Sequence, residues 1–343
     1  MNQNQCVVLA SRPDGMPVEA NFRLESRPIP TLGPGQILCR NLFVSLDAGF
    51  RNWMDEDSGD DVLPAMPVGE PVMGLTLSRV MESRHPDYQP GDLLMARFAW
   101  ETYTVTDAGD FISRLPPDPD QPLSYYLGVL GDTGLSAYFG LTDFGAIKPG
   151  ETVLVSAAAG AVGSVAGQIA RIYGARTVGI TSTQEKCARL ISELGYDAAI
   201  DRTARDLDRA FEAACPQGID VYFDNVGGPL LELVLDHINP EARILLCGSV
   251  AAYNSREPQP GPRNLFQLTT KHAHMHGFMT HLQLARYDQA RKVLAGWIKE
   301  GRLKVHEHRL SGIENVGRAF CELFRGANFG KTLVAIAPAS EID

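Results

Sequence analysis

The stretch from Glu151 to Gln168, ETVLVSAAAGAVGSVAGQ, constrains the fold of this chain more than any other. A run of mostly β-branched residues, Thr152 to Val155, leads into alanines and glycines, and an uncharged helical pattern follows. This order predicts the strand, turn and helix that open a dinucleotide-binding βαβ unit, with a second strand at Thr177 to Thr181. Gly160 and Gly163 lack a Cβ atom, so the backbone can turn tightly and approach a pyrophosphate at the helix N-terminus.

The same stretch has other interpretations. It is long enough for a transmembrane helix, but its alanine, glycine and serine content would drive membrane insertion poorly. A flavin site or an S-adenosylmethionine site on a similar turn stays open as an alternative.

The residues that follow the second strand indicate which dinucleotide is bound. NAD-binding units usually carry Asp or Glu about 20 residues past the glycine turn, whereas Thr181 to Thr183 occupy that region here. No carboxylate there would repel a 2′-phosphate, and Lys186 follows within one helical turn. Arg202 could add a second cation, each attraction being worth on the order of a few kcal/mol. We therefore predict NADPH as the cofactor, although either cation could instead be an ordinary solvated side chain.

Composition limits the classes of partner. The chain has 343 residues, room for two domains, and a formal net charge of −10, which argues against nucleic acid or an anionic membrane as the main partner. Six scattered cysteines without a CxxC motif are typical of free thiols in a reducing compartment. The N-terminus shows no basic and apolar signal-peptide pattern, so we expect a cytoplasmic protein.

The chain divides by pattern into an α/β protein of two domains. Residues 1–127 are rich in proline and glycine with short apolar runs and predict a mostly β domain, to which the β-rich segment 306–343 is expected to return. Residues 128–305 alternate strands and helices, as a doubly wound parallel sheet requires. Its five candidate strands are VLVSA, TVGIT, DAAID, VYFDN and RILLCG.

This combination resembles the zinc-independent medium-chain dehydrogenase/reductase superfamily. Within it the chain looks like the leukotriene hydroxydehydrogenase/prostaglandin reductase branch, which includes curcumin reductases and alkenal double-bond reductases. The pieces that carry the resemblance are AAAGAVGSVAGQIA, DVYFDNVGG, CGSVAAYN, HGFM and GANFGK, in that order along the chain. The resemblance implies a GroES-like, mostly β catalytic domain beside a Rossmann domain.

The resemblance also implies a cofactor site. Gly160 to Gly163 would hold the pyrophosphate and Lys186 the 2′-phosphate, while Arg202 stands where many relatives have tyrosine. The full set of implied cofactor contacts is Gly160, Ala161, Val162, Gly163, Lys186, Arg202, Asn225, Cys247, Gly248, Ser249, Tyr253, Phe278, Met279, Thr280 and Asn328. Asn225 would lie beside the nicotinamide, unless it only caps the turn between its strand and the next helix.

The substrate pocket is where the chain departs from the family pattern. Ala48 and Gly49 follow Asp47 where relatives often have an aromatic residue and proline, and Asp132 with Thr133 replaces a common Met-Pro. The residues expected to line this pocket are Asp47, Arg51, Asp132 and Phe278. Asp47 and Arg51 could pair and shape the cleft, or be purely structural, so the resemblance indicates the reaction class better than the substrate.

No metal is expected. Gly69 to Pro71 stand where the zinc enzymes of this superfamily carry Gly-His-Glu, and Val44 to Asp47 contain no cysteine. A catalytic zinc needs about three protein ligands. Three histidines alternate along KHAHMHG and would share one side of a strand, but we interpret them as half-exposed residues of that strand: His272, His274 and His276.

Without a Lewis acid, an α,β-unsaturated carbonyl is easier to reduce than a simple ketone, because hydride can add to its β-carbon and charge collects on an enolate oxygen. Tyr253, just past a strand end, is the best candidate to hydrogen-bond that oxygen, with a ribose hydroxyl as the other donor. A packing tyrosine is the competing interpretation. Alternatives to the ene-reductase hypothesis are a quinone reductase, a secondary-alcohol dehydrogenase and a non-catalytic NADPH-binding protein. We also expect a homodimer, formed by an edge strand at HAHMHGFM.

Overall fold

The computed structural model describes residues 3–58, 63–116, 120–255, 257 and 260–342. The chain forms two compact units. The first contains Met1–Gly131, Glu307–Ala327 and Thr332–Asp343, and the second contains Asp132–His306 and Asn328–Lys331. No helix among the described residues is long and apolar enough to cross a membrane.

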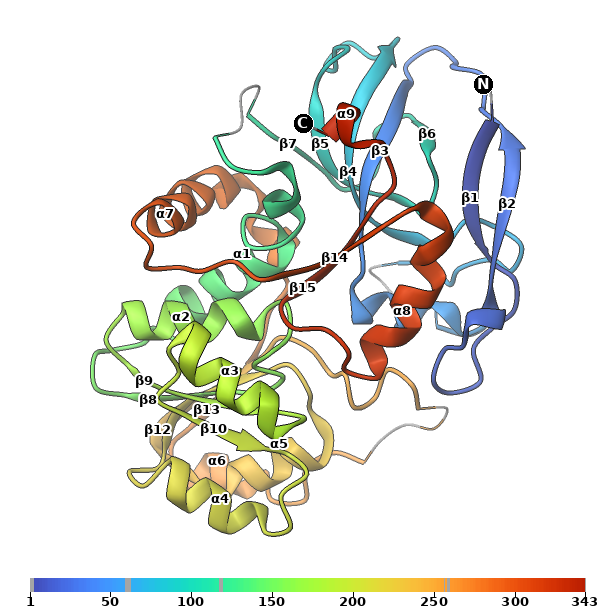
Figure 1. Ribbon diagram of the computed structural model, residues 1–343. Coiled ribbons are helices and arrows are strands. Elements are labelled where there is room, and N and C mark those ends of the chain that lie inside the picture. Colours follow the sequence, from blue (N-terminus) through green and yellow to red (C-terminus); the bar gives the residue numbers. More distant parts are fainter. Residues whose placement is uncertain (1–2, 59–62, 117–119, 256, 258–259, 343) are drawn as a thin grey trace. The chain divides into compact units, whose positions relative to one another are not determined.

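The first unit is built on antiparallel strands (Figure 1). These are β1 (Gln3–Leu9), β2 (Phe22–Pro28), β3 (Ile37–Ser45), β4 (Met73–Ser83), β5 (Leu93–Ala99), β6 (Tyr103–Thr106), β7 (Ile112–Arg114), β14 (Glu307–Ser311) and β15 (Lys331–Ala335). β1 and β2 form a two-stranded sheet. The others form a seven-stranded sheet in the order β14-β15-β3-β4-β5-β7, with β6 also paired to β3. One core cluster of this sheet contains Ile37, Cys39, Val80, Leu94, Ala96 and Phe98.

Helices complete the first unit. They are α8 (Val316–Phe324) and α9 (Ala339–Ile342), with short 3-10 helices at Glu19–Asn21, Ala48–Met54, Leu123–Leu127 and Ile313–Asn315. The sequence indicated a β-rich C-terminal segment, and β14 and β15 are indeed strands, but α8 lies between them and was not foreseen. Its buried residues Val316, Ala319 and Phe320 recur at the helical spacing of three and four.

The second unit contains six parallel strands. They are β8 (Thr152–Val155), β9 (Arg176–Thr181), β10 (Ala198–Asp201), β11 (Ile219–Asp224), β12 (Ile238–Leu246) and β13 (His274–Gly277). Their order across the sheet is β10-β9-β8-β11-β12-β13. Counted from β8, this is the 3-2-1-4-5-6 order of a dinucleotide-binding Rossmann sheet.

Helices alternate with these strands. They are α1 (Asp132–Phe139), α2 (Gly163–Ile172), α3 (Gln184–Leu194), α4 (Leu207–Ala214), α5 (Gly228–Leu235), α6 (Phe266–Thr270) and α7 (Tyr287–Lys299). A π-helical turn at Gly140–Phe144 follows α1, and a 3-10 segment at Thr280–Arg286 precedes α7.

Both faces of the parallel sheet are covered, so its central strands are continuously apolar rather than alternating. Every residue of β8 is buried. Leu154, Tyr222 and Ile244 point to the face that is packed with α4 and α5. On neighbouring strands Val155 and Phe223 are equally buried. α3 ends at Gly195, whose left-handed φ of 73° is typical of a helix C-terminus.

Candidate functional site

The strand order reverses between β8 and β11, and polar residues meet at that point. In an open α/β sheet, ligands bind outside the carboxyl ends of the strands at such a switch point. Ser156 follows β8 and Asn225 follows β11. The Asn225 amide nitrogen donates to the Ser156 hydroxyl at 2.8 Å, and its side-chain Nδ2 donates to the Ser156 carbonyl at 2.7 Å. Asn225 therefore joins the ends of β8 and β11, whereas the turn between β11 and α5 is hydrogen-bonded by the Asp224 carboxylate.

The glycine turn lies directly beyond β8. Ala157 adopts a left-handed φ of 47° and its carbonyl accepts the Gly160 amide at 2.8 Å. A Cβ at Gly163 would stand 2.4 Å from that carbonyl oxygen, whereas a Cβ at Gly160 would stand 3.1 Å from it. Gly163 is thus required by the turn itself. The amides of Ala161 and Val162 lead into α2, whose N-terminal donors and dipole favour an anion.

Cations gather at the ends of β9 and β10. Lys186 lies in the first turn of α3, where its amide donates to the Thr183 hydroxyl at 3.2 Å. Burial lowers the pKa of Lys186, and the neighbouring charges of Arg189 and Arg202 lower it further. The two cations singled out in the sequence therefore act on one another. A dianion placed between them would relieve their repulsion. The end of β9 at Thr181 carries no carboxylate, whereas β10 ends in the buried Asp201, which pairs in register with Thr181 and is hydrogen-bonded by Thr203.

Arg189 and the segment Asn328–Lys331 lie at the same carboxyl end of the parallel sheet, next to the glycine turn. The Arg189 guanidinium lies 3.8 Å from the ring centre of Phe329 and pairs with Glu193 at 2.6 Å. The Gly330 amide donates to the Ala159 carbonyl at 2.8 Å, so this segment is attached to the glycine turn. Asn328 is buried, and its Nδ2 donates to the Gly330 carbonyl at 3.0 Å.

The loop after β12 carries Tyr253. The Ser249 amide donates to the Tyr253 hydroxyl oxygen at 3.0 Å. This contact uses an acceptor position of the phenol and leaves its O–H free to donate. Burial raises the pKa of Tyr253 above its usual value; the Ser249 amide opposes this in part, and Cys247 and Asp224 add smaller increases. Burial also raises the pKa of the Cys247 thiol. The phenol therefore stays protonated at neutral pH, as a hydrogen-bond donor must.

Phe278, the first residue after β13, packs among other aromatic side chains. The Phe278 ring lies 5.1 Å from the Phe144 ring and 6.2 Å from the Phe223 ring. Gly140 makes room for this group, because a Cβ there would stand 2.7 Å from Phe278. The Thr280 hydroxyl hydrogen-bonds Ser136 of α1. Phe278 is half-buried, so part of its ring remains accessible.

The residues expected in the substrate pocket fall in different places. Asp132 begins α1 in the second unit, whereas Asp47 and Arg51 belong to the first. The ion pair suggested between Asp47 and Arg51 is not formed, because Arg51 pairs with another residue. Arg51 is 1% exposed and pairs with Asp55 at 2.9 Å, while Asp47 accepts a hydrogen bond from Ser45. The 3-10 helix at 48–54 directs Arg51 toward Asp55, four residues further on.

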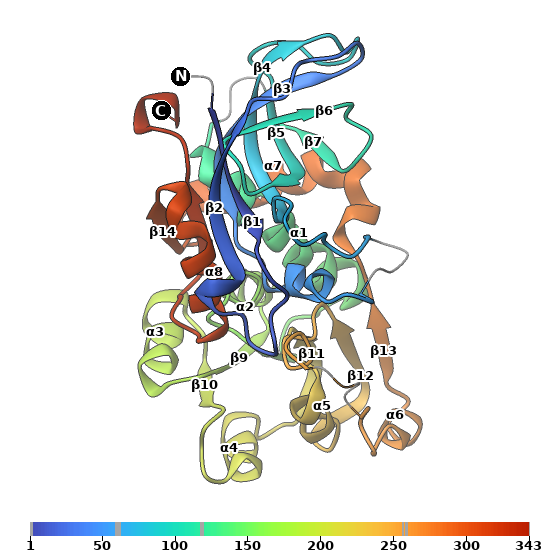
Figure 2. The ribbon, with the colours of Figure 1, turned by 90° about the vertical axis from the view of Figure 1, so that its right-hand side faces the viewer.

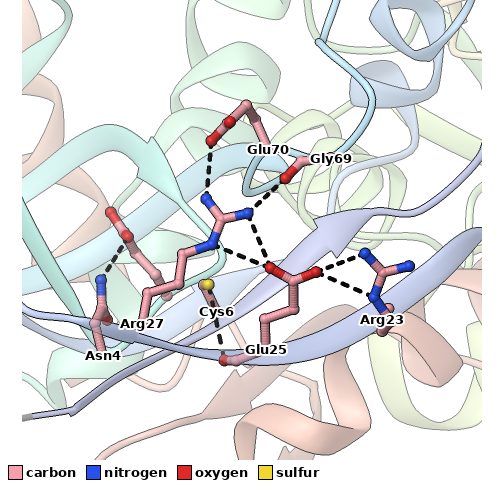
Figure 3. Close-up of polar contacts among 8 residues, drawn as sticks. Asn4, Cys6, Arg23, Glu25, Arg27, Gly69 and Glu70 are labelled. Atoms are coloured by element: carbon pink, nitrogen blue, oxygen red, sulfur yellow. Dashed lines mark hydrogen bonds and ion pairs between the residues drawn. The ribbon is translucent and has the colours of Figure 1, made fainter.

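The turn at Gly69 and Glu70 is fixed by ion pairs (Figure 3). Arg27 donates to the Gly69 carbonyl at 2.5 Å and to the Glu70 carboxylate at 2.9 Å. The same guanidinium pairs with Glu25, which also binds Arg23. The Glu70 carboxylate is therefore engaged by Arg27 at the position that corresponds to the zinc-binding motif.

The three alternating histidines do not all lie on one strand. His272 precedes β13 with a left-handed φ of 49°, so the expected shared side applies only to His274 and His276. His276 stacks on Phe144 at 4.4 Å. Within the described part of the chain, no group of three or more His, Cys, Asp or Glu side chains is placed to hold a metal ion. Metal independence stays a prediction.

Sequence reasoning missed two polar residues of the switch point, Ser156 and Asp224. Both are fully buried and hydrogen-bonded to each other at 3.1 Å. Their signal was present, because each is a polar residue at the carboxyl end of an apolar strand, the edge of the sheet where ligands bind.

Comparisons with known proteins agree with this geometry. Residues 5–113 match the family described as the N-terminal domain of oxidoreductase, and residues 161–296 match the family described as zinc-binding dehydrogenase. The chain is 40% identical over 340 residues to the NADPH-dependent curcumin reductase of Escherichia coli (strain K12), covering 98% of this chain and 97% of the relative. It is 37% identical over 325 residues to prostaglandin reductase 1 of Rattus norvegicus, covering 94% and 95%.

Solved structures show the same fold. The crystal structure of CurA from Vibrio vulnificus has a TM-score of 0.90 at 36% identity, covering 98% of this chain and 99% of that chain. The structure of CurA from Vibrio vulnificus in complex with NADPH has a TM-score of 0.89 at 37% identity, covering 97% and 99%. The fold is thus that of a medium-chain dehydrogenase/reductase. The chain belongs to the branch of that superfamily that contains the curcumin reductases and prostaglandin reductases.

Proposed function

We propose that this chain is an NADPH-dependent reductase of the carbon–carbon double bond of α,β-unsaturated aldehydes and ketones. The observation that carries the proposal is Tyr253, a protonated phenol held by the Ser249 amide in the loop at the carboxyl end of β12. The membership of the curcumin and prostaglandin reductase branch supports the same reaction class.

The described residues fit NADPH. The glycine turn after β8 leads into α2, whose N-terminal amides and dipole favour a pyrophosphate. Lys186 and Arg202 supply adjacent positive charges for a 2′-phosphate, and Thr181 at the end of β9 stands where an NAD-binding unit would carry a carboxylate. Asn225, Phe278 and Asn328 remain proposed cofactor contacts.

The chemistry that follows is hydride reduction of a polarised alkene. Bound NADPH supplies the hydride. The Tyr253 O–H would donate to the carbonyl oxygen of the substrate and stabilise the enolate that forms when the β-carbon is reduced, a contribution of ~2–4 kcal/mol in a dry site. Because the phenol remains protonated, it can give this hydrogen bond throughout the reaction. Protonation of the α-carbon then completes the saturated product.

The direct test is NADPH oxidation by the purified protein with a panel of enones, quinones and simple ketones. We expect turnover with enones, loss of the alkene signal in the product by NMR and a retained carbonyl group. An alcohol product, or activity confined to quinones, would replace the proposal by one of the two alternative reductase functions. NADPH binding without turnover of any panel member would indicate the non-catalytic alternative.

We further propose a homodimer formed through β13. This strand lies at an end of the parallel sheet and pairs with β12 alone among the described strands (Figure 2). Five large apolar side chains that flank it in sequence are exposed: Leu265, Phe266, Met279, Leu282 and Leu284. An open apolar edge of this kind is usually covered. A cytoplasmic location is also proposed, because all six cysteines are free thiols.

A further inference from the structure

The fully buried carboxylate of Asp224 is used by no step of the proposed reaction. It stands at the carboxyl end of β11, and its Oδ1 atom receives four hydrogen bonds: from the Tyr222 hydroxyl at 2.8 Å, the Ser156 hydroxyl at 3.1 Å, and the Val226 and Gly227 amides at 2.9 Å each. Its Oδ2 atom is buried without a hydrogen-bond partner. Burying a carboxylate in this way is costly, so the arrangement calls for an explanation.

Two of these donors belong to the turn that carries Asn225. The carboxylate accepts hydrogen bonds from the amides of Val226 and Gly227, two and three residues further along the chain. These bonds hold the chain in a tight turn after β11. The turn enters a conformation that favours glycine, with a φ of 68° at Gly227 and 58° at Gly228. Asp224 thus fixes the direction in which the carbonyls of this turn point.

Those carbonyls in turn bind the loop of Tyr253. The Asn225 carbonyl accepts the Val250 amide at 3.2 Å, and the Val226 carbonyl accepts the Ala251 amide at 3.0 Å. The Asp224 carbonyl itself accepts the amides of Cys247 and Gly248, at 2.9 and 3.1 Å. The loop from Cys247 to Tyr253 is therefore attached at successive points to a turn that the Asp224 carboxylate organises.

The turn after β11 and the loop from Cys247 to Tyr253 also pack closely against each other. A Cβ at Gly248 would stand 3.2 Å from both the Asn225 carbonyl oxygen and the Tyr253 hydroxyl. A Cβ at Gly227 would stand 2.9 Å from the Ser249 hydroxyl. A side chain at either glycine would force the turn or the loop to move, so a shift of the turn is transmitted to the phenol.

We infer that Asp224 is a positioning residue, which holds the Tyr253 hydroxyl in place for the substrate through the turn Asn225–Gly227. This inference rests on the proposed function, because it assumes that Tyr253 binds the substrate oxygen. Asp224 itself touches neither substrate nor cofactor in this role.

The test is a double-mutant cycle with Asp224→Asn and Tyr253→Phe, in which coupled residues give non-additive effects. Asparagine keeps the shape and one acceptor oxygen but loses the charge-assisted hydrogen bonds. We expect Asp224→Asn to lower kcat by about tenfold with the NADPH dissociation constant changed less than about twofold. In the Tyr253→Phe background the same substitution should lower kcat by less than about twofold. An equal loss in both backgrounds would overturn the inference and make Asp224 a purely structural residue.

A second variant covers the case that Asp224→Asn does not fold. Ser156→Ala removes one donor to the carboxylate and the acceptor of the Asn225 amide, and should give a smaller loss of kcat that likewise disappears beside Tyr253→Phe. Tyr222→Phe is the matched control, since it removes a donor to the same oxygen but leaves the turn intact, and kcat should stay within about twofold.

An activity-independent measurement separates this inference from the proposed function. In protein labelled with carbon-13 at the tyrosine Cζ, the Tyr253 resonance is identified by its loss in Tyr253→Phe. We expect it to shift or broaden in Asp224→Asn and to stay unchanged in Tyr222→Phe. An unmoved resonance in Asp224→Asn would contradict the inference even if the enzyme reduces enones. A moved resonance in a protein inactive on enones would instead contradict the proposed function alone.

Discussion

Single positive charges at the ends of β9 and β10 should decide which cofactor this enzyme prefers. Lys186 is half-buried, and Arg202 is near enough to lower its pKa, so a 2′-phosphate there would neutralise two cations at once. We expect Lys186→Ala to raise the Michaelis constant for NADPH at least about tenfold, or ~1.4 kcal/mol, with NADH use nearly unchanged. Steady-state kinetics with both cofactors measures this, and Lys292→Ala, an exposed lysine on α7, is the control. An equal rise in the Michaelis constant for NADH would show that Lys186 does not bind the 2′-phosphate.

The phenol of Tyr253 gives a prediction with a defined pH sign. Burial raises its pKa, and the donating form is the protonated one, so kcat should stay level as pH rises and fall only above the ordinary tyrosine value near 10. Tyr253→Phe should lower kcat roughly ten- to a thousandfold, leave NADPH affinity almost unchanged and abolish that alkaline decline. Tyr173→Phe is the control, because burial also raises that tyrosine's pKa, at the far end of α2. Unaltered turnover in Tyr253→Phe would mean that the tyrosine only packs.

Residue types at strand ends were predictable, but their partners were not. The sequence places Lys186 and Arg202 after consecutive strands, and parallel strands end at the same edge, so their proximity follows from the topology. Arg51 illustrates the opposite case. Its pairing with Asp55 rather than Asp47 depends on a 3-10 helix at 48–54 that no periodicity in the sequence indicates.

At the scale of elements, two glycines of the turn between β8 and α2 differ in how much a side chain would disturb the turn. Gly163 is required by the fold, because a Cβ would stand 2.4 Å from the Ala157 carbonyl and 2.6 Å from the Ala158 Cα atom. At Gly160 the nearest atom would be the Ala157 carbonyl oxygen at 3.1 Å, so a Cβ there requires a smaller adjustment of the turn than at Gly163. We expect Gly163→Ala to lower the melting temperature by several degrees, a cost of roughly 1–3 kcal/mol. Gly160→Ala should leave the melting temperature nearly unchanged and weaken NADPH binding at least about tenfold.

Calorimetry and fluorescence titration of both variants measure this contrast. Similar melting temperatures for Gly163→Ala and Gly160→Ala would show that the turn adapts to a side chain at either position. NADPH binding unchanged in Gly160→Ala would show that the pyrophosphate lies elsewhere.

Elements with a strong pattern were predictable, and those defined by packing were not. The strand at Thr152–Val155 has the bounds that its β-branched run indicates. α8 was missed because its nine residues lie between two strands, and a short helix is stabilised by the apolar face it buries rather than by its own propensity. The left-handed φ at His272 removed that residue from the expected strand, which alternation of histidines alone could not reveal.

For the molecule as a whole, we predict catalysis without a metal. Arg27 engages Glu70 and the Gly69 carbonyl at the turn that corresponds to the zinc motif, and Val44 to Asp47 supply no cysteine. Full NADPH-dependent activity should remain after dialysis against a chelator. Zinc at one atom per chain, with activity lost on its removal and restored on its return, would contradict this prediction. Weak retention of a metal by the exposed histidines near β13 would not contradict it.

The assembly should be a homodimer joined along β13. Phe266 is 72% exposed and Leu282 is 73% exposed, on the segments that precede and follow this edge strand in sequence. Pairing with a second copy would satisfy the free backbone groups of the strand and cover these side chains. Light scattering at micromolar concentration should give a dimer mass, and the double variant Phe266→Asp with Leu282→Glu should give a monomer. Met81→Glu, which charges an exposed apolar residue of β4 in the first unit, should remain dimeric. A monomeric wild-type protein would exclude the assembly, and a dimeric double variant would place its interface on another surface.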